Sequence, residues 1–238
     1  MINPLFFLEK DKLLNCDMIE LIQRNEADIL YSEEDGVLLL EKNMKDGYAC
    51  YSMSAENENA ASKMAGLITY RKEFDLILHQ NQFEKAVRNV LELDEKHCEP
   101  CYLEIYEKKE APALTNVAGI DIKPLTMGDY NFVCKNYDAG AEYIKDRIRF
   151  GMVGAFDNGK CVGFGGFHHD GSIGFLTVLP SYRKRGIAKA LTTRLIARAI
   201  KEKRTPFSHV FFGNDVSLAF HESMGFTKMD RDVCWIFK

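Results

Sequence analysis

Long apolar runs are missing from this sequence of 238 residues, and none approaches the roughly 18–20 residues that a membrane-spanning helix needs. The opening, MINPLFFLEKDKLL, has no basic start before its short apolar run, so no signal peptide is predicted. The seven cysteines are odd in number and scattered, which favours thiols in a reducing compartment over a disulfide framework. These absences predict a cytoplasmic protein that does not bind membranes.

Two motif-like stretches lack the partners that their functions require. GFGGF (163–167) contains the glycines of a dinucleotide-binding loop, but no helix follows it, which excludes a Rossmann site and favours close packing or a bulge. HCEPC (97–101) contains one C-x-x-C, whereas a zinc site needs two more ligands at suitable spacing. We interpret it as a loop with free cysteines and expect no metal.

The formal net charge of −4 is unevenly distributed. Residues 1–115 carry 13 Lys and Arg against 23 Asp and Glu, whereas residues 116–238 carry 18 against 12. Nine basic residues and one acid fall between Arg183 and Arg204. A local basic element in an otherwise acidic protein favours a compact anionic ligand over a long nucleic acid. Beyond Arg194, a solvated helix face is the simpler interpretation.

Both halves of the chain alternate predicted strands and helices. In the first half, Phe83, Val87, Val90 and Leu91 fall on one helical stripe. The first half is predicted to hold strands at 36–42, 48–54, 74–80 and 101–108, and helices at 58–68 and 82–93. The second is predicted to hold strands at 120–126, 208–213, 226–230 and 232–238, three more within 152–180, and helices at 127–137, 141–150, 181–203 and 215–225.

This order predicts an α/β (α+β) fold with a mixed, mostly antiparallel sheet flanked by helices. Asp157-Asn158-Gly159 and Asp170-Gly171 supply hairpin turns. Charge and small residues replace periodicity over Glu107–Asp121, so we expect two domains, residues 1–115 and 116–238.

The stretch SYRKRGIAKAL (181–191) joins an apolar strand to a long helix, with Arg185–Ala188 in the first helical turn. A helix start leaves backbone N–H groups unpaired and carries partial positive charge, so it is a natural phosphate site. Gly186 would let an anion approach the backbone closely. The alternative is a surface corner with incidental basic residues. The basic side chains are Arg183, Lys184, Arg185 and Lys189, and the buried helical stripe is predicted at Ile187, Leu191, Leu195, Ile196 and Ile200.

The context of this corner resembles the acyl-CoA signature of the GNAT superfamily of N-acetyltransferases. That signature is an L-x-V-x-P strand end followed by [RQ]-x-x-G-x-[GA], and GNDVSLAFHESMGF (213–226) is similar to a helix motif further along the same family. The resemblance covers residues 118–238. The matching residues are Leu176, Val178 and Pro180, then Arg183, Gly186 and Ala188, and downstream Asn214, Ser217, Gly225 and Phe226.

The resemblance implies that acyl-CoA enters a gap between the strand ending at Val178 and the strand 208–213. Backbone groups of Leu176, Thr177 and Val178 would then pair with the pantetheine amides. The amides of Arg185, Gly186, Ile187 and Ala188 would hold the pyrophosphate, helped by the charges of Arg183, Lys184 and Lys189. Asn214, in the motif that also contains Ser217, would contact the pantetheine arm.

The catalytic groups match the family less closely. His221 stands where the family often places the tyrosine that protonates the leaving thiolate, and a histidine can donate near neutral pH. The alternative is an ordinary surface histidine on an amphipathic helix. The usual glutamate would fall near Ser172, which is no general base. Nearby His168, His169 and Asp170 are candidates to take the amine's proton, or else form a polar hairpin turn.

The implied activity is N-acetylation: acetyl-CoA and a primary amine of a small-molecule or peptide acceptor react directly in one ternary complex, without a metal. The first half lacks its own [RQ]-x-x-G-x-[GA] and resembles the degenerate leading lobe of two-lobed FR47-like and glycine N-acyltransferase-like relatives. A catalytically inactive acyl-CoA-binding regulatory protein is the alternative. The acidic first half argues against a nucleic-acid partner.

Overall fold

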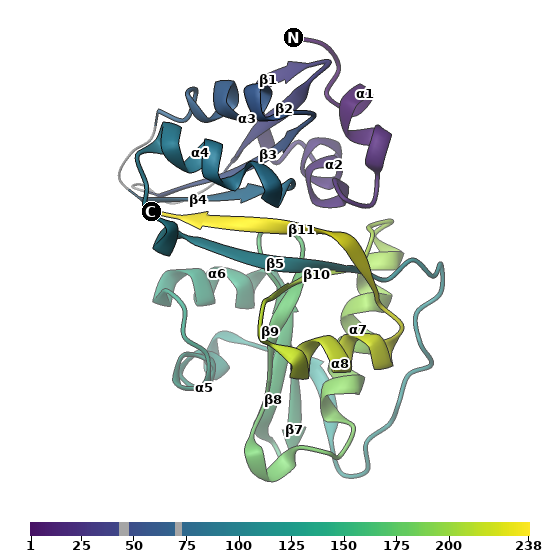
Figure 1. Cartoon of the computed structure of the whole chain (residues 1–238). Helices are drawn as coiled ribbons and strands as arrows, with labels where there is room; N and C mark the ends of the chain where they lie inside the picture. Colours follow the sequence, from purple (N-terminus) through teal and green to yellow (C-terminus); the bar gives the residue numbers. More distant parts are fainter. Residues whose placement is uncertain (43–47, 70–72) are drawn as a thin grey trace. The chain divides into compact units, whose positions relative to one another are not determined.

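The computed structural model describes residues 1–42, 48–69 and 73–238 (Figure 1). The chain divides into two compact units, each built from separate stretches of sequence. The first unit comprises Met1–Glu104, His209–Phe220 and Lys228–Lys238, and the second comprises Ile105–Ser208 and His221–Thr227.

The first unit contains a seven-stranded sheet in the order β1-β2-β3-β4-β11-β5-β10. The last strand of the chain therefore lies between two strands from its first half, as Figure 1 shows for yellow β11 beside β4 and β5. Strands β3 and β4 pair in parallel, and β4 pairs with β11 in antiparallel fashion. The strands are β1 (Ala27–Glu33), β2 (Gly36–Glu41), β3 (Tyr48–Ala55), β4 (Glu73–Leu78), β5 (Cys98–Ile105), β10 (Phe207–Phe211) and β11 (Thr227–Phe237).

Two apolar cores cover the faces of this sheet, because alternate residues of a strand point to opposite sides. On β2, Leu38 belongs to one core, whereas Val37 and Leu39 belong to the other. The Leu38 core includes side chains of α3 and α4, and the other core includes side chains of α1 and α2. These helices are α1 (Leu5–Leu8), α2 (Cys16–Gln23), α3 (Glu58–Ala65) and α4 (Glu84–Leu91).

The second unit contains a four-stranded antiparallel sheet in the order β6-β7-β8-β9. Helices α5 and α6 pack on one face, where Phe164 and Phe175 are buried, and α7 packs on the other, against Leu176 and Val178 (Figure 1). The strands are β6 (Asp121–Pro124), β7 (Val153–Asp157), β8 (Lys160–Phe167) and β9 (Ile173–Val178). The helices are α5 (Tyr130–Asn136), α6 (Ala141–Phe150) and α7 (Ile187–Lys201), and α8 (Asp215–Met224) runs from the first unit into the second.

The structure confirms the predicted α/β fold and most of its elements, with the following differences. Residues 98–101 of HCEPC begin strand β5 instead of forming a loop, and the two predicted terminal strands are one strand, β11. Strand β1 and helices α1 and α2 were not predicted. Val90 is 37% exposed, so it lies outside the core that contains Val87 and Leu91. The predicted helix 181–203 begins only at Ile187, because Lys184 and Gly186 before it have positive φ.

No helix in the described ranges is long and apolar enough to cross a lipid bilayer. All seven cysteines lie in those ranges, and none of them forms a disulfide.

Candidate functional site

Strand β9 is the last strand of its sheet and carries a bulge near its centre. The pairs Phe164–Thr177 and Gly166–Gly174 leave Phe175 and Leu176 of β9 opposite Gly165 alone. Phe175 has φ +55, a left-handed conformation that is strained for an aromatic residue. The residue is also buried, at 1% exposure. A bulge turns backbone groups out of the regular ladder, so β9 offers N–H and C=O groups at an edge that its own sheet does not use.

The corner between β9 and α7 forms a second group of backbone donors. The first bond within α7 runs from the N–H of Ala190 to the carbonyl of Gly186, at 3.0 Å. The N–H groups of Ile187, Ala188 and Lys189 precede this bond and have no acceptor in the helix. Gly186 has φ +84, and a Cβ built on it would come no closer than 3.9 Å to Val117. The corner is therefore open enough for a phosphate to approach the backbone.

Side chains tie this corner to its neighbours. The Arg183 guanidinium donates from Nε to the Val178 carbonyl at 3.2 Å, which links the corner to the end of β9. The Arg185 guanidinium lies 5.1 Å from the centre of the Tyr182 ring. The Tyr182 hydroxyl in turn donates to Asp157 at 2.9 Å. Arg183, Lys184, Arg185 and Lys189 are all exposed, so their charges face solvent or a ligand.

Of the four basic residues beyond Arg194 and up to Arg204, Lys201 and Lys203 are exposed as the sequence suggested, whereas Arg198 and Arg204 bind backbone carbonyls. Arg198 donates to the carbonyls of Gly151 (2.9 Å) and Phe150 (3.1 Å), at the end of α6. Arg204 is only 8% exposed and donates to the Gly171 carbonyl at 2.8 Å. Both arginines hold backbone carbonyls of the second unit in place.

The loop between β8 and β9 is closed by a buried carboxylate. Asp170 is 0% exposed, and its Oδ1 accepts bonds from the Ser172 N–H (2.9 Å) and hydroxyl (2.8 Å). His168 stacks on Phe175 with ring centres 4.5 Å apart, and its Nδ1 lies 2.9 Å from the Tyr143 hydroxyl. Burial raises the pKa of Tyr143 above its usual range, and the Asp170 charge adds to this effect. His169 is half-buried, with its ring edge-on to Tyr143 at 5.6 Å.

His221 is buried at 6% exposure, so it is not the surface histidine considered as the alternative. Its ring stacks on Phe226 with centres 5.0 Å apart, and its carbonyl accepts the Phe226 N–H at 3.1 Å. Asn214 is exposed and caps α8, where its Oδ1 accepts the Ser217 N–H at 3.2 Å. Asn214 and Ser217 belong to the first unit, so their contact with acyl-CoA stays a prediction, as does the position of His221 beside the thioester.

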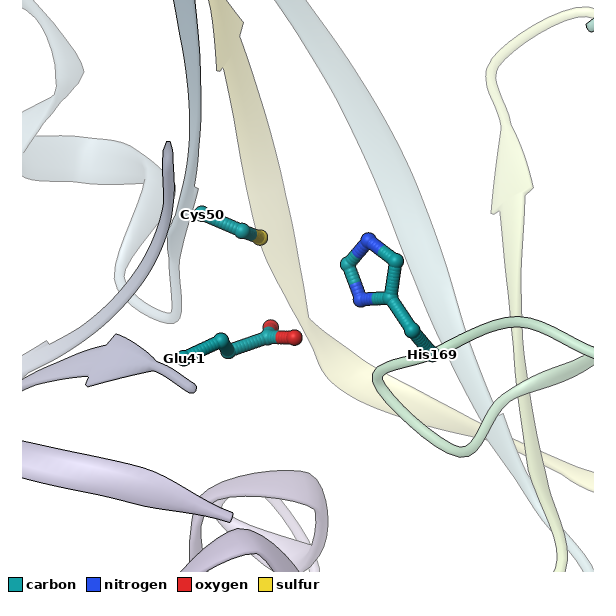
Figure 2. Close-up of side chains that lie close together, drawn as sticks. All are labelled: Glu41, Cys50 and His169. Carbon is teal, nitrogen blue, oxygen red and sulfur yellow. The ribbon is translucent and has the colours of Figure 1, made fainter. Parts of the chain in front are cut away.

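Three potential metal ligands are labelled in Figure 2, where the His169 ring projects from the β8–β9 loop. Glu41 and Cys50 belong to the first unit and His169 to the second. Within either unit alone, the described residues do not bring three His, Cys, Asp or Glu ligand atoms together.

The bulged edge and the open helix start lie within a segment that matches a known family. Residues 122–226 match the family model described as Acetyltransferase (GNAT) family. The chain carries a GNAT acetyltransferase domain. A search of curated proteins finds no match.

The GNAT fold extends beyond the matched segment. A structural-genomics protein from Drosophila is 15% identical with a TM-score of 0.67, and the match covers 99% of this chain and 90% of the other. The GCN5-related N-acetyltransferase from Kribbella flavida is 12% identical with a TM-score of 0.62, covering 95% and 94%. A tandem GNAT protein from the clavulanic acid biosynthesis pathway is 13% identical with a TM-score of 0.52, covering 93% and 86%. At these identities the likeness shows the fold alone, and it is consistent with two lobes.

The corner of this GNAT domain has the features that the phosphates of acyl-CoA require. The backbone N–H groups are open, no side chain caps the start of α7 at Gly186, and the basic side chains are exposed. Phe175 was not identified from the sequence, because IGFLTV contains only ordinary strand residues around it. The sequence also offered no reason to link Tyr182 and Asp157 to the corner between β9 and α7. The aromatic residue within the basic stretch was the only signal for Tyr182.

Proposed function

We propose that this GNAT protein is an N-acyltransferase that moves the acetyl group of acetyl-CoA to a primary amine of a small-molecule or peptide acceptor. One observation carries the proposal: a single unit contains two sets of open backbone groups. One set lies at the bulged edge of β9, and the other lies at the start of α7, which no side chain caps. A strand edge suits the amides of a pantetheine arm, and a helix start suits a pyrophosphate.

Each part of acyl-CoA has a proposed set of partners in this chain. Backbone groups of Leu176, Thr177 and Val178 would bind the pantetheine amides, and those of Arg185–Ala188 the pyrophosphate. Arg183, Lys184 and Lys189 would add charge, and Asn214 would contact the arm, with Ser217 in the same motif. Bound in this way, acetyl-CoA supplies an activated acyl group.

The reaction would occur in one ternary complex, because neutral amine and thioester held together need no covalent enzyme intermediate. Backbone donors near Val178 would stabilise negative charge on the carbonyl oxygen. A ring nitrogen of His221 would give a proton to the leaving sulfur. For the amine's proton we favour His169 over Asp170, because the Asp170 carboxylate is fully buried and bonded to Ser172.

We also propose that residues 116–238 form the catalytic GNAT domain and that residues 1–115 form a lobe that binds no coenzyme A. The comparison between α3 and α7 supports this division. In α3, the Asn57 side chain already accepts the Ala60 N–H at 3.0 Å, and Glu58 adds negative charge to the first turn. The start of α7 has no side-chain cap and no acid in its first turn. Seven cysteines without disulfides suit a reducing cytoplasm.

Two measurements on the full chain test this function. Titration calorimetry with coenzyme A measures binding, and a thiol-release assay with acetyl-CoA and a panel of amines measures transfer. We expect saturable binding and thiol release that depends on the amine. Binding with no release on any amine would favour the inactive regulatory protein, and absence of binding would refute the acyl-CoA site.

A further inference from the structure

The Arg185 side chain lies over an aromatic ring at the corner between β9 and α7. Its guanidinium carbon is 5.1 Å from the centre of the Tyr182 ring. Arg185 is exposed, whereas Tyr182 is half-buried and packs against the apolar core that contains Ile187 and Leu191. A guanidinium is planar and stacks on flat groups. Arg185 can therefore rest on Tyr182 and present its outer face to a ligand.

The ring beneath Arg185 is held in place by a carboxylate of the same unit. The Tyr182 hydroxyl donates to Oδ2 of Asp157 at 2.9 Å, and the side-chain amide of Asn158 donates to Oδ1 at 2.9 Å. The bond to Asp157 raises the pKa of Tyr182, so the hydroxyl stays protonated and remains a donor at neutral pH. Tyr182 is thus a platform that is set before any ligand binds, which lowers the entropy cost of binding.

The proposed contacts with acyl-CoA leave the Arg185 side chain unassigned. Its backbone N–H belongs to the proposed pyrophosphate donors, whereas the Arg183 guanidinium is directed to the Val178 carbonyl at 3.2 Å. In coenzyme A, the pyrophosphate joins the pantetheine arm to the adenosine. With the arm along β9, the adenosine begins at this corner, within reach of the Arg185 side chain. All of these residues belong to the second unit.

We propose that the Arg185 guanidinium stacks on the adenine base of acetyl-CoA, with Tyr182 behind it and Asp157 holding Tyr182; this rests on the proposed acyl-CoA site. Nucleobases stack on arginine guanidinium planes as they do on aromatic rings. A lysine has the same charge but no plane, so it cannot replace arginine in this contact. If Arg185 instead bound a phosphate as a simple charge, lysine would serve.

Recognition of adenine selects the acyl donor. A carrier protein presents its acyl group on phosphopantetheine, which has the same arm and a phosphate but no adenine. The preferred donor is therefore a free acyl-CoA instead of an acyl group on a carrier protein.

The stack can be observed without turnover. Ethenocoenzyme A carries a fluorescent, slightly larger adenine, and acrylamide quenches this fluorescence where the base is exposed to solvent. At saturating protein, we expect acrylamide to quench the base bound to the wild type much less than the free ligand, and the base bound to Arg185→Lys like the free ligand. Tyr182→Phe, which keeps the ring but loses the bond to Asp157, should give intermediate protection. Equal quenching with wild type and Arg185→Lys would overturn the proposal, whereas no binding of this ligand would refute the acyl-CoA site itself.

Affinities give the second test, measured by titration calorimetry with coenzyme A and with phosphopantetheine. Arg185→Lys should bind coenzyme A about fivefold more weakly, the low end of the contribution of a stacked base, and phosphopantetheine as the wild type does. Arg194→Lys is the matched control, since Arg194 is also exposed and lies on α7, and it should leave both affinities unchanged. Thermal melts show whether each variant is folded. Equal weakening for both ligands, or no weakening for coenzyme A, would overturn this inference and leave the acyltransferase function standing.

Discussion

Gly186 is the position at which the proposed pyrophosphate site is most sensitive to a single change. Its φ of +84 lies in the left-handed region, where a residue with a Cβ costs about 1–2 kcal/mol. A Cβ would meet nothing nearer than 3.9 Å, so no steric clash adds to this cost. We therefore expect Gly186→Ala to stay folded and to lower the free energy of unfolding by about 1 kcal/mol. In a chain of this size that is roughly a 2–4 °C fall in Tm.

Gly186→Glu adds a negative charge where the pyrophosphate would bind. Two like charges about 4 Å apart repel by roughly 4 kcal/mol at the effective dielectric constant of a protein surface. Salt screens part of this repulsion, so we expect the binding free energy of coenzyme A to weaken by about 2 kcal/mol. This loss corresponds to an affinity about 30-fold lower. Gly186→Ala should weaken binding less, because it removes space without adding charge.

Gly159→Ala provides the matched control. Gly159 has φ +81 and no atom within 4 Å of a built Cβ, so its substitution carries the same backbone cost. It should lower Tm by a similar amount and leave coenzyme A affinity unchanged. Titration calorimetry and thermal melts on the four proteins separate the two effects. A folded Gly186→Glu variant that binds coenzyme A like the wild type would refute a pyrophosphate site at this corner.

Two further predictions concern buried histidines. His221→Ala should lower turnover about 10²–10⁴-fold with coenzyme A affinity nearly intact, and His221→Tyr should retain more activity than alanine. Equal rates for wild type and the alanine variant, with chemistry rate-limiting, would exclude His221 as the acid. In the first unit, Nε2 of His79 lies 2.8 Å from Oδ1 of Asp17, and both residues are 1% exposed. Asp17→Asn should cost about 3–5 kcal/mol of unfolding free energy in denaturant titrations. Burial lowers the pKa of His79, but the Asp17 carboxylate and the backbone hydrogen bonds of Met53 and Ile77 together raise it by more. The net shift is upward, so this stabilisation is complete below about pH 6.5 and lost as pH rises through the raised pKa. A stability difference between wild type and Asp17→Asn that grows with rising pH would contradict this sign.

Local signals in the sequence predicted the elements of the second unit well. The predicted helix at 141–150 is α6 itself, because its apolar residues keep a helical period. The predicted turn at Asp157-Asn158-Gly159 joins β7 to β8. Asn158 and Gly159 have φ of +47 and +81, as a two-residue hairpin loop requires. Such features depend on residues close together in the chain.

Features set by distant contacts could not be predicted in the same way. The left-handed Phe175 follows no turn residue pattern, and its ring packs against Tyr137 and His168 from other elements. The place of β11 between β4 and β5 depends on pairing across more than half the chain. Arg198 and Arg204 looked like surface charges because the carbonyls they bind are remote in sequence.

The central claim is that this GNAT protein transfers an acetyl group from acetyl-CoA to an amine. The most direct measurement is mass spectrometry of the products after incubating the full chain with isotope-labelled acetyl-CoA and each amine of the panel. The account predicts a labelled N-acetylated amine, formed together with free coenzyme A and only when the protein is present. Saturable coenzyme A binding without labelled amide, on any amine of the panel, would contradict it.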